Sequence, residues 1–239
     1  MNSIREPEPH HRVLHHKLKG AFAPTYLTLL SIVQAVALAD LAGIVAAEHQ
    51  QFTVVQWLLV LLTFCMLISI WNVYTIQVAI WDWIPDVRDA AMPFVVGALE
   101  LYLNHAIMLS LSYWLLGFAG IATMGALGTW YMHWRAKTEV ENAQLLSLLT
   151  SHHLVFALYY AGGTVLLLLL AWASRVGGFE AAERVQGVQG ALAVGTALFV
   201  GVSLVVAMII SHLYWRKAIV YARSGQLPGL RSERRGFLR

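Results

Sequence analysis

Long apolar stretches alternate with short polar segments along the chain, at about residues 23–47, 53–80, 91–109, 112–134, 153–174 and 189–215. A helix needs about 20 mainly apolar residues to cross the hydrocarbon core of a bilayer, which is roughly 30 Å thick. Each stretch comes close to that length or exceeds it. The pattern therefore predicts an all-α, polytopic membrane protein that folds as a six-transmembrane-helix bundle.

Three boundaries need a further argument. A single helix over residues 91–134 would be about 66 Å long, twice the bilayer core, so a hairpin is expected around Ser110 to Ser112. The second stretch is expected to end before Pro85, because a residue that precedes proline disfavours helix. Leu145, Leu146 and Leu149 lie in the polar segment 135–152, and they predict a short helix on the membrane surface there.

The composition supports a membrane class. Hydrophobic residues make up 59% of the chain and charged residues 12%, with a mean hydropathy of +0.64. Soluble domains carry roughly 25% charged residues. We expect a basic, His-rich segment over residues 1–22, a transmembrane domain over 23–221 and a basic tail over 222–239. These divisions leave no room for a separate soluble domain.

The distribution of basic residues predicts the orientation, because cytoplasmic loops collect Lys and Arg. With the N-terminus inside the cell, Arg175 and Arg184 are the only basic residues outside. Tryptophan rings favour membrane interfaces, and Trp114 and Trp81 are expected near the outer and inner surfaces respectively. Both termini are therefore predicted to be cytoplasmic, in a multi-pass protein of the inner (plasma) membrane.

Two acids lie within the apolar stretches, Glu100 near the middle of the third and Asp40 in the outer half of the first. An ionisable group in hydrocarbon is costly and needs a partner or a role. Asn104 follows Glu100 by one helical turn, and His105 is adjacent. Asp40 and Asn104 are expected at similar depths, so these four residues are candidates for a proton relay or a cation site. The alternative is that Glu100 is a protonated packing residue and that Asp40 opens to the outer surface.

Other polar residues in the apolar stretches are weaker candidates. Asn72, Gln77 and Tyr160 are the best of them for lining a pore. Most Ser and Thr residues in such helices are expected to bond their own backbone.

Histidine is concentrated on the predicted inner side. Neutral imidazole binds zinc or copper and can ligate haem iron, and His133, His153 and His212 are the possible ligands within the bundle. Surface chemistry or pH sensing are the alternatives. No cofactor motif accompanies these residues, so no cofactor is predicted, and haem or metal is kept as an alternative.

The tail carries Arg231, Arg234 and Arg235, which are expected to bind anionic lipids at the cytoplasmic face. A tail this short contains no structural element that could recognise nucleic acid, so no nucleic-acid partner is expected.

These observations predict a protein that passes a small cation or a proton, as a channel or simple transporter, and as a homo-oligomer or beside a partner membrane subunit. No catalytic residue is assigned, and enzymatic activity is not expected. The alternatives are a non-catalytic accessory or assembly subunit of a membrane complex, and a redox subunit that binds haem or metal.

Overall fold

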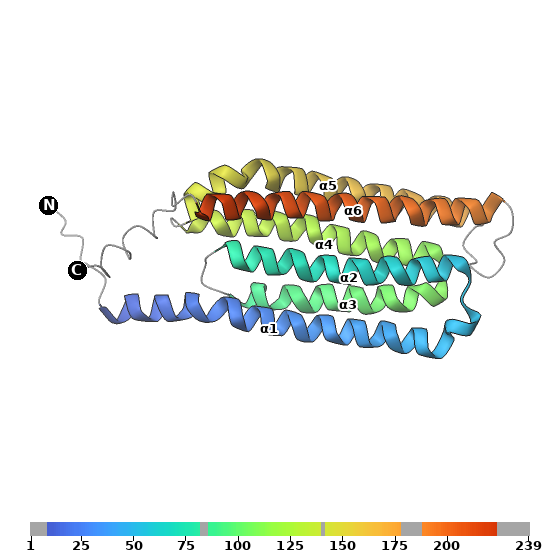
Figure 1. Ribbon diagram of the computed structural model, residues 1–239, viewed down its shortest axis with the longest axis horizontal. Helices are drawn as coiled ribbons and strands as arrows, with labels where there is room; N and C mark the ends of the chain where they lie inside the picture. The colour runs from blue at the N-terminus through green and yellow to red at the C-terminus, as the bar shows by residue number, and fades with distance from the viewer. Residues whose placement is uncertain (1–8, 82–85, 140–141, 178–187, 224–239) are drawn as a thin grey trace.

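The computed structural model describes residues 9–81, 86–139, 142–177 and 188–223, and in these ranges it contains helices and no strand (Figure 1). The elements are α1 (Pro9–Glu48), the 3-10 helix η1 (His49–Gln51), α2 (Val54–Ile80), α3 (Val87–Leu109), α4 (Leu111–Thr138), α5 (Ala143–Val176) and α6 (Val188–Arg223).

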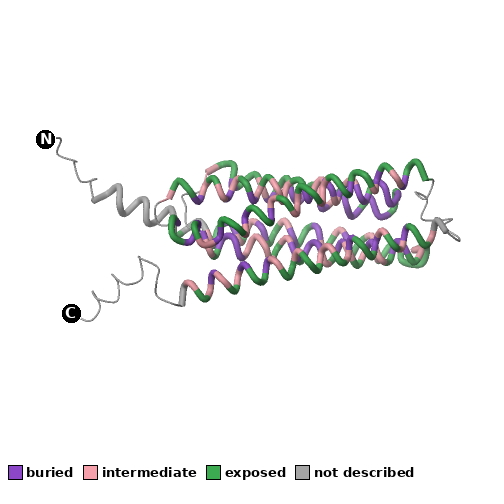
Figure 2. The backbone as a smooth tube through the Cα atoms, turned by 90° about the horizontal axis from the view of Figure 1, so that it is seen from above, coloured by how far each residue is buried: buried purple, intermediate pink, exposed green. Residues whose placement is uncertain are grey.

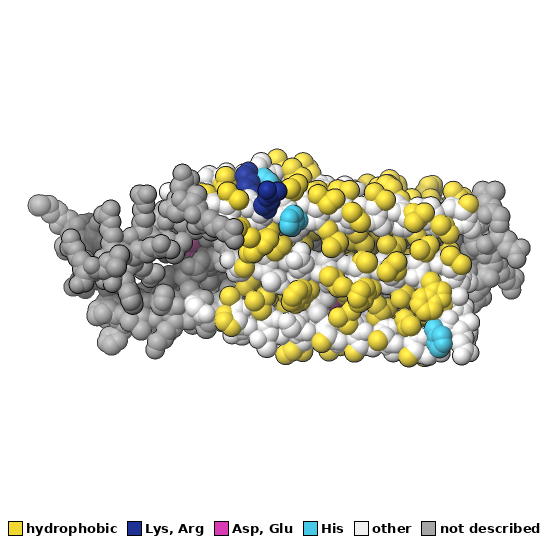
Figure 3. All heavy atoms as spheres, viewed as in Figure 1, with side chains coloured by type: hydrophobic (Ala, Val, Ile, Leu, Met, Phe, Trp, Pro, Cys, Tyr) yellow, Lys and Arg dark blue, Asp and Glu magenta, His cyan; other side chains and the backbone are white. Residues whose placement is uncertain are grey.

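Six helices in the described ranges are long and apolar enough to cross a membrane, which confirms the all-α class and the expected number of apolar helices. Apolar side chains such as Leu158, Trp172 and Val202 are 63–65% exposed. Figure 3 shows hydrophobic side chains spread over the coloured part of the bundle on the face it views. In a membrane this surface faces lipid, so its exposure is not costly.

Local polar residues define where several helices begin. The Thr53 hydroxyl accepts a hydrogen bond from the Gln56 N–H, and the Gln56 side chain accepts one from the Thr53 N–H, which is a capping box at the start of α2. Ser110 separates α3 from α4: its N–H donates to the Ala106 carbonyl, and its hydroxyl accepts from the Tyr113 N–H. The expected hairpin is therefore confirmed.

The segment 135–152 differs from the prediction. α4 continues to Thr138 and α5 already begins at Ala143, so Ala143 to His152 form the first turns of a long helix and not a separate one. Leu145, Leu146 and Leu149 are buried, because they pack against Ala136 and Tyr214 in the core near this end of the bundle. The prediction of a short surface helix here is wrong.

The helices run along one common direction, and buried positions face the interior of the bundle over its length (Figure 2). α3 packs against α1 and α4, α5 packs mainly on α4, and α6 packs mainly on α2. α1 begins and α6 ends at the same end of the bundle (Figure 1). α1 also starts at Pro9, well before its apolar stretch.

Two of the tryptophans expected near the membrane surfaces are buried against neighbouring side chains, close to the ends of their helices. Trp114 is 0% exposed, and its Nε1–H donates to the Thr63 hydroxyl at 2.9 Å. Trp81 is 3% exposed and donates to the Gln77 side chain at 3.1 Å. Each indole N–H is satisfied by another helix or by the preceding turn, which allows the ring to be buried.

Candidate functional site

The interface of α1 and α3 holds the most buried acid of the described chain. Gly97 brings the two helices close, since a Cβ at this position would overlap Val33 Cγ1. Glu100 lies one turn further along α3, and its Oε1 accepts a hydrogen bond of 2.5 Å from Gln34 Nε2 on α1. Glu100 is 0% and Gln34 4% exposed, so the pair is sealed from the surface.

The next turn of the same interface brings the other three predicted relay residues together. Asn104 Nδ2 donates to the Ala37 carbonyl at 2.8 Å and to Asp40 Oδ2 at 3.0 Å. His105 Nε2 lies 3.5 Å from Asp40 Oδ1. The His105 side chain is 66% exposed and that of Asp40 26%, so the polar contacts reach the surface here. Glu100 contacts Gln34 and makes no hydrogen bond to Asp40 in the described structure.

Three buried oxygens at this interface have no hydrogen-bond partner among the described residues: Gln34 Oε1, Glu100 Oε2 and Asn104 Oδ1. All three are acceptors, so the site has more acceptors than donors. Leaving a buried polar atom unpaired costs about 1–3 kcal/mol. A proton on Glu100, a water molecule or a small cation would supply the missing donor or charge.

Two tyrosines lie further along the bundle in the other direction, one on α1 and one on α2. Tyr74 on α2 lies within electrostatic range of Glu100. Its ring is 6.1 Å, centroid to centroid, from the ring of Tyr26 on α1. Tyr26 in turn lies within electrostatic range of Asp89 and Tyr131. A cavity of about 20 Å³ is bordered by Tyr26, Tyr74, Asp89 and Tyr131. That volume accommodates a water molecule.

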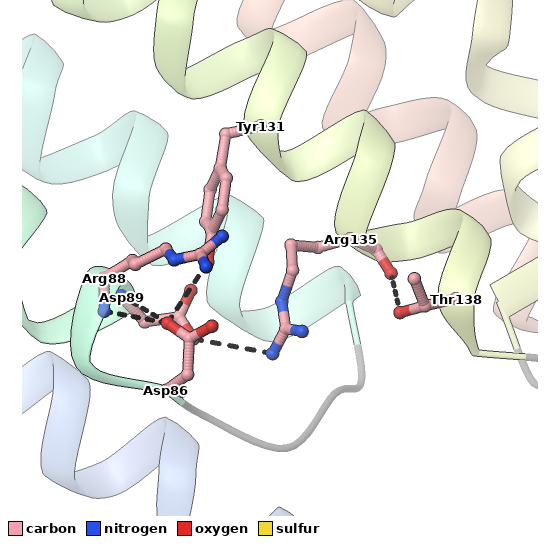
Figure 4. A network of polar contacts seen from close by, with 6 residues as sticks. All are labelled: Asp86, Arg88, Asp89, Tyr131, Arg135 and Thr138. Atoms are coloured by element: carbon pink, nitrogen blue, oxygen red, sulfur yellow. Dashed lines mark hydrogen bonds and ion pairs between the residues drawn. The ribbon is translucent and has the colours of Figure 1, made fainter.

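A cluster of charged residues lies at the start of α3, beyond Tyr26 and Tyr74 (Figure 4). Asp86 caps the helix by accepting hydrogen bonds from the N–H groups of Arg88 and Asp89 at 2.7 and 3.3 Å. Arg135 Nη2 on α4 lies 3.7 Å from Asp89 Oδ2, and the Tyr131 hydroxyl donates to Asp86 at 3.4 Å. Burial acts to raise the pKa of Asp86, but these backbone hydrogen bonds and the charges of Arg135 and Arg88 outweigh it and lower the pKa.

We call this series the polar column. It is made up of His105, Asp40, Asn104, Gln34, Glu100, Tyr74, Tyr26, Asp89, Tyr131, Arg135 and Asp86. Asp89 and His105 are 16 positions apart on α3, which corresponds to about 24 Å of helix. The polar column therefore extends over most of a hydrocarbon core that is roughly 30 Å thick.

Seven residues of the polar column are not among the candidates predicted from the sequence: Gln34, Tyr26, Tyr74, Asp89, Tyr131, Arg135 and Asp86. Gln34 is a polar residue within an apolar stretch, which is a signal that could have been used. Asp89 follows Asp86 at capping-box spacing, which predicts a helix start and not burial against Arg135. The tyrosines have no local signal, because a tyrosine within an apolar helix can simply pack into the core of a bundle.

The three pore-lining candidates lie elsewhere. Asn72, Gln77 and Tyr160 border a cavity of about 400 Å³ between α2, α4, α5 and α6. The cavity and the polar column share Tyr74 at their border. Whether these residues line a path for ions stays a prediction.

Two of the three histidine candidates meet. His133 Nδ1 and His153 Nδ1 are 3.0 Å apart, and His153 Nε2 lies 3.1 Å from the Tyr214 hydroxyl. His212 is exposed on α6 and takes no part in this contact. Within the described ranges, no three His, Cys, Asp or Glu side chains are placed to hold a metal ion. The haem or metal alternative stays a prediction, as does lipid binding by Arg231, Arg234 and Arg235, which lie outside the described residues.

Six apolar helices, each long enough to cross a bilayer, are typical of a multi-pass α-helical membrane protein. Comparison with known proteins finds no matching family model, no matching characterised protein and no matching solved structure. The function is therefore argued from the geometry of the site.

Proposed function

We propose that the protein passes protons across the membrane along the polar column, with Glu100 as its central carrier. The observation that carries the proposal is a carboxyl group with 0% exposure and one unpaired oxygen, between two polar ends of the bundle. Such a group is expensive to keep in hydrocarbon without a role. If the Glu100 carboxyl alternately gains and loses a proton, the unpaired oxygen is the atom that would carry the proton.

Proton passage is favoured over passage of larger ions by the space around Glu100. The helices are in direct contact at Gly97, and the cavity beside Tyr26 and Asp89 is only about 20 Å³. A proton needs hydrogen-bonding groups and single water molecules, whereas a hydrated cation needs a continuous opening. A path of this kind also needs only one subunit, so oligomer formation is not part of the proposal.

The two ends of the polar column would have different roles. Asp40 and His105 form the exposed end, where a carboxylate and an imidazole can exchange protons with water. Asn104 positions Asp40 through its hydrogen bond. At the opposite end, Asp86 is partly exposed and would exchange protons with water, and Arg135 beside Asp89 places a positive charge there.

For orientation, we propose that the end with Asp86 and Arg135 faces the cytoplasm, in the inner (plasma) membrane. The asymmetry of Lys and Arg along the chain supports this. The basic tail would then bind anionic lipids of the same leaflet.

The test is proton flux in proteoliposomes that contain a pH-sensitive dye, driven by a potassium diffusion potential. Glu100→Gln keeps the shape of the side chain and cannot ionise, so we expect a folded protein without flux. The matched control is Glu48→Gln at the end of α1, which removes a carboxyl outside the polar column and should leave flux unchanged.

Two further measurements complete the test. Glu100→Ala leaves Gln34 without its acceptor and should damage both folding and flux. Measuring the uptake of radioactive sodium and rubidium into the same proteoliposomes separates passage of protons from passage of small cations. If Glu100→Gln folds and conducts like the parent protein, Glu100 serves packing only and the proposal is overturned.

A further inference from the structure

The cavity of about 400 Å³ lies outside the interface that carries Glu100. α5 packs mainly on α4 and α6 mainly on α2, while α5 and α6 touch each other little. The cavity occupies the space between these two helix pairs. Its size falls in the range of about 300–1,000 Å³ that is typical of small-molecule sites.

Glycine keeps this space open. A Cβ added at Gly162 or at Gly163 would meet no atom within 4 Å, and both residues border the cavity. At Gly125, by contrast, the ring of Tyr160 already lies 3.0 Å from where a Cβ would be. Tyr160 is thus held against α4, and the volume beside α5 stays unfilled.

The lining is uncharged. The side chains that border the cavity include no Asp, Glu, Lys, Arg or His, and most are apolar. Three of its hydroxyl groups are already used: Ser69, Thr129 and Ser203 donate to carbonyls of their own helices. A charged group would have no counter-charge here, so the cavity suits a neutral molecule.

Several polar side chains at the cavity remain available, among them those of Asn72 and Tyr160. In the described part of the chain, neither the Asn72 amide nor the Tyr160 hydroxyl has a hydrogen-bond partner. Together they can donate to a carbonyl oxygen and accept from a hydroxyl group. A few such groups in an apolar cavity fix the orientation of a ligand.

The cavity opens on the surface that faces lipid. Leu158, Leu166, Phe199 and Met208 border it and are also 39–64% exposed. These four residues belong to α5 and α6, so a ligand would enter sideways from the bilayer between these helices. Entry from the hydrocarbon phase selects for lipophilic molecules.

From this geometry we propose that the cavity binds one neutral lipid with a compact head that carries carbonyl or hydroxyl oxygen. Isoprenoid quinones and sterols both have this chemistry. The apolar body would lie against the glycine-lined side of α5, and the head oxygen would bond to Asn72 or Tyr160. This site is independent of the proposed proton passage.

The experiment is equilibrium binding of radiolabelled probes to the full chain in phosphatidylcholine nanodiscs, with protein-free nanodiscs as background. The probes are decylubiquinone, cholesterol and, as the charged comparison, dodecanoate at pH 8. Saturable binding of one neutral probe per chain is expected, and its identity distinguishes the quinone from the sterol. Flux is not measured, so failure here leaves the proton proposal untouched.

Three variants locate the site. Gly163→Leu fills the cavity and should abolish saturable binding, while its melting temperature stays at or above that of the parent. Gly43→Leu is the matched control, because a Cβ at this lipid-facing position also meets nothing within 4 Å. Tyr160→Phe and Asn72→Leu should each weaken binding roughly threefold to tenfold, as expected for one hydrogen bond.

Each contrary result overturns the proposal. It fails if neither neutral probe binds saturably, if dodecanoate binds as tightly as they do, or if Gly163→Leu binds like the parent. Equal loss in Gly43→Leu would show that the variants act through general stability and not through the cavity.

Discussion

Gln34 provides the hydrogen bond that holds Glu100 in the bundle, although both residues lie deep between apolar helices. Gln34→Leu removes that bond and leaves both carboxyl oxygens of Glu100 unpaired. We expect the free energy of unfolding to fall by about 1–3 kcal/mol, measured by thermal melting in detergent.

A double variant checks the reason for this loss. Replacing both partners, as Gln34→Leu with Glu100→Leu, removes the unpaired atoms together and should recover most of the lost stability. If the double variant is as unstable as the sum of the two single variants, the hydrogen bond does not account for the effect. Ser31→Ala, on the exposed side of α1, serves as the neutral control.

Asp86 combines a capping role with a charge. Asp86→Ala should lower the free energy of unfolding by about 1 kcal/mol, because α3 loses its N-cap, whereas Asp86→Asn retains a capping oxygen and should cost less. The folded protein lowers the pKa of Asp86. The charge of Asp86 therefore stabilises the fold above the unfolded pKa of about 3.9, and this contribution is lost as the pH falls through the lower, folded value.

Melting curves from pH 3 to pH 7 test this sign. The difference between the parent and Asp86→Asn should be largest near neutral pH and shrink toward pH 3. A difference that grows with acidity would contradict the assignment.

Contact between α1 and α3 depends on Gly97, because a Cβ there would overlap Val33. Gly97→Ala should therefore separate the helices and destabilise the protein by about 1–3 kcal/mol. Gly43→Ala, in open space on α1, should instead stabilise α1 slightly because alanine favours helix.

A second substitution tests whether the clash is the cause. Val33→Ala removes the methyl groups that the new Cβ would meet, so it should restore stability to Gly97→Ala. Gly97→Ala should also lower proton flux, because the distance between Gln34 and Glu100 depends on the same contact. Val33→Ala should restore that flux together with the stability. No recovery in either measurement would place the effect of Gly97 elsewhere.

In α5, packing places in the core a segment whose sequence is typical of a surface helix. In residues 143–152, apolar and polar side chains recur with helical spacing, which is typical of an amphipathic helix on a membrane surface. Their apolar side is covered instead by α4 and α6, so the segment joins the bundle and positions His153 against His133 and Tyr214. A helix that continues without a break also satisfies its own backbone hydrogen bonds.

The positions of the helix ends predict which parts of the chain share one side of the membrane. α1 begins and α6 ends at one end of the bundle, and α5 ends and α6 begins at the other (Figure 1). A reporter inserted after Gly178 should be outside the cytoplasm, and reporters at either terminus should be inside. Cytoplasmic activity of the Gly178 fusion would overturn the proposed orientation, although the helix count would remain.

The sequence alone determined the class, the number of spans and the hairpin at Ser110, because each depends on local properties: the length of an apolar stretch and the capping of a turn. It also drew attention to Glu100 and Asp40, since a charge in an apolar stretch is visible without neighbours. The functional roles of these residues remain predictions.

Only the tertiary structure decided which helices touch, and therefore which polar groups meet. Gln34 became the partner of Glu100 because α1 packs on α3 at Gly97, and the 400 Å³ cavity exists because α5 and α6 pack on different neighbours. Lipid removes the apolar driving force that usually selects helix pairs in water, so close fit and polar contacts choose them in its place. Those contacts join residues far apart in the chain, and no local pattern records them.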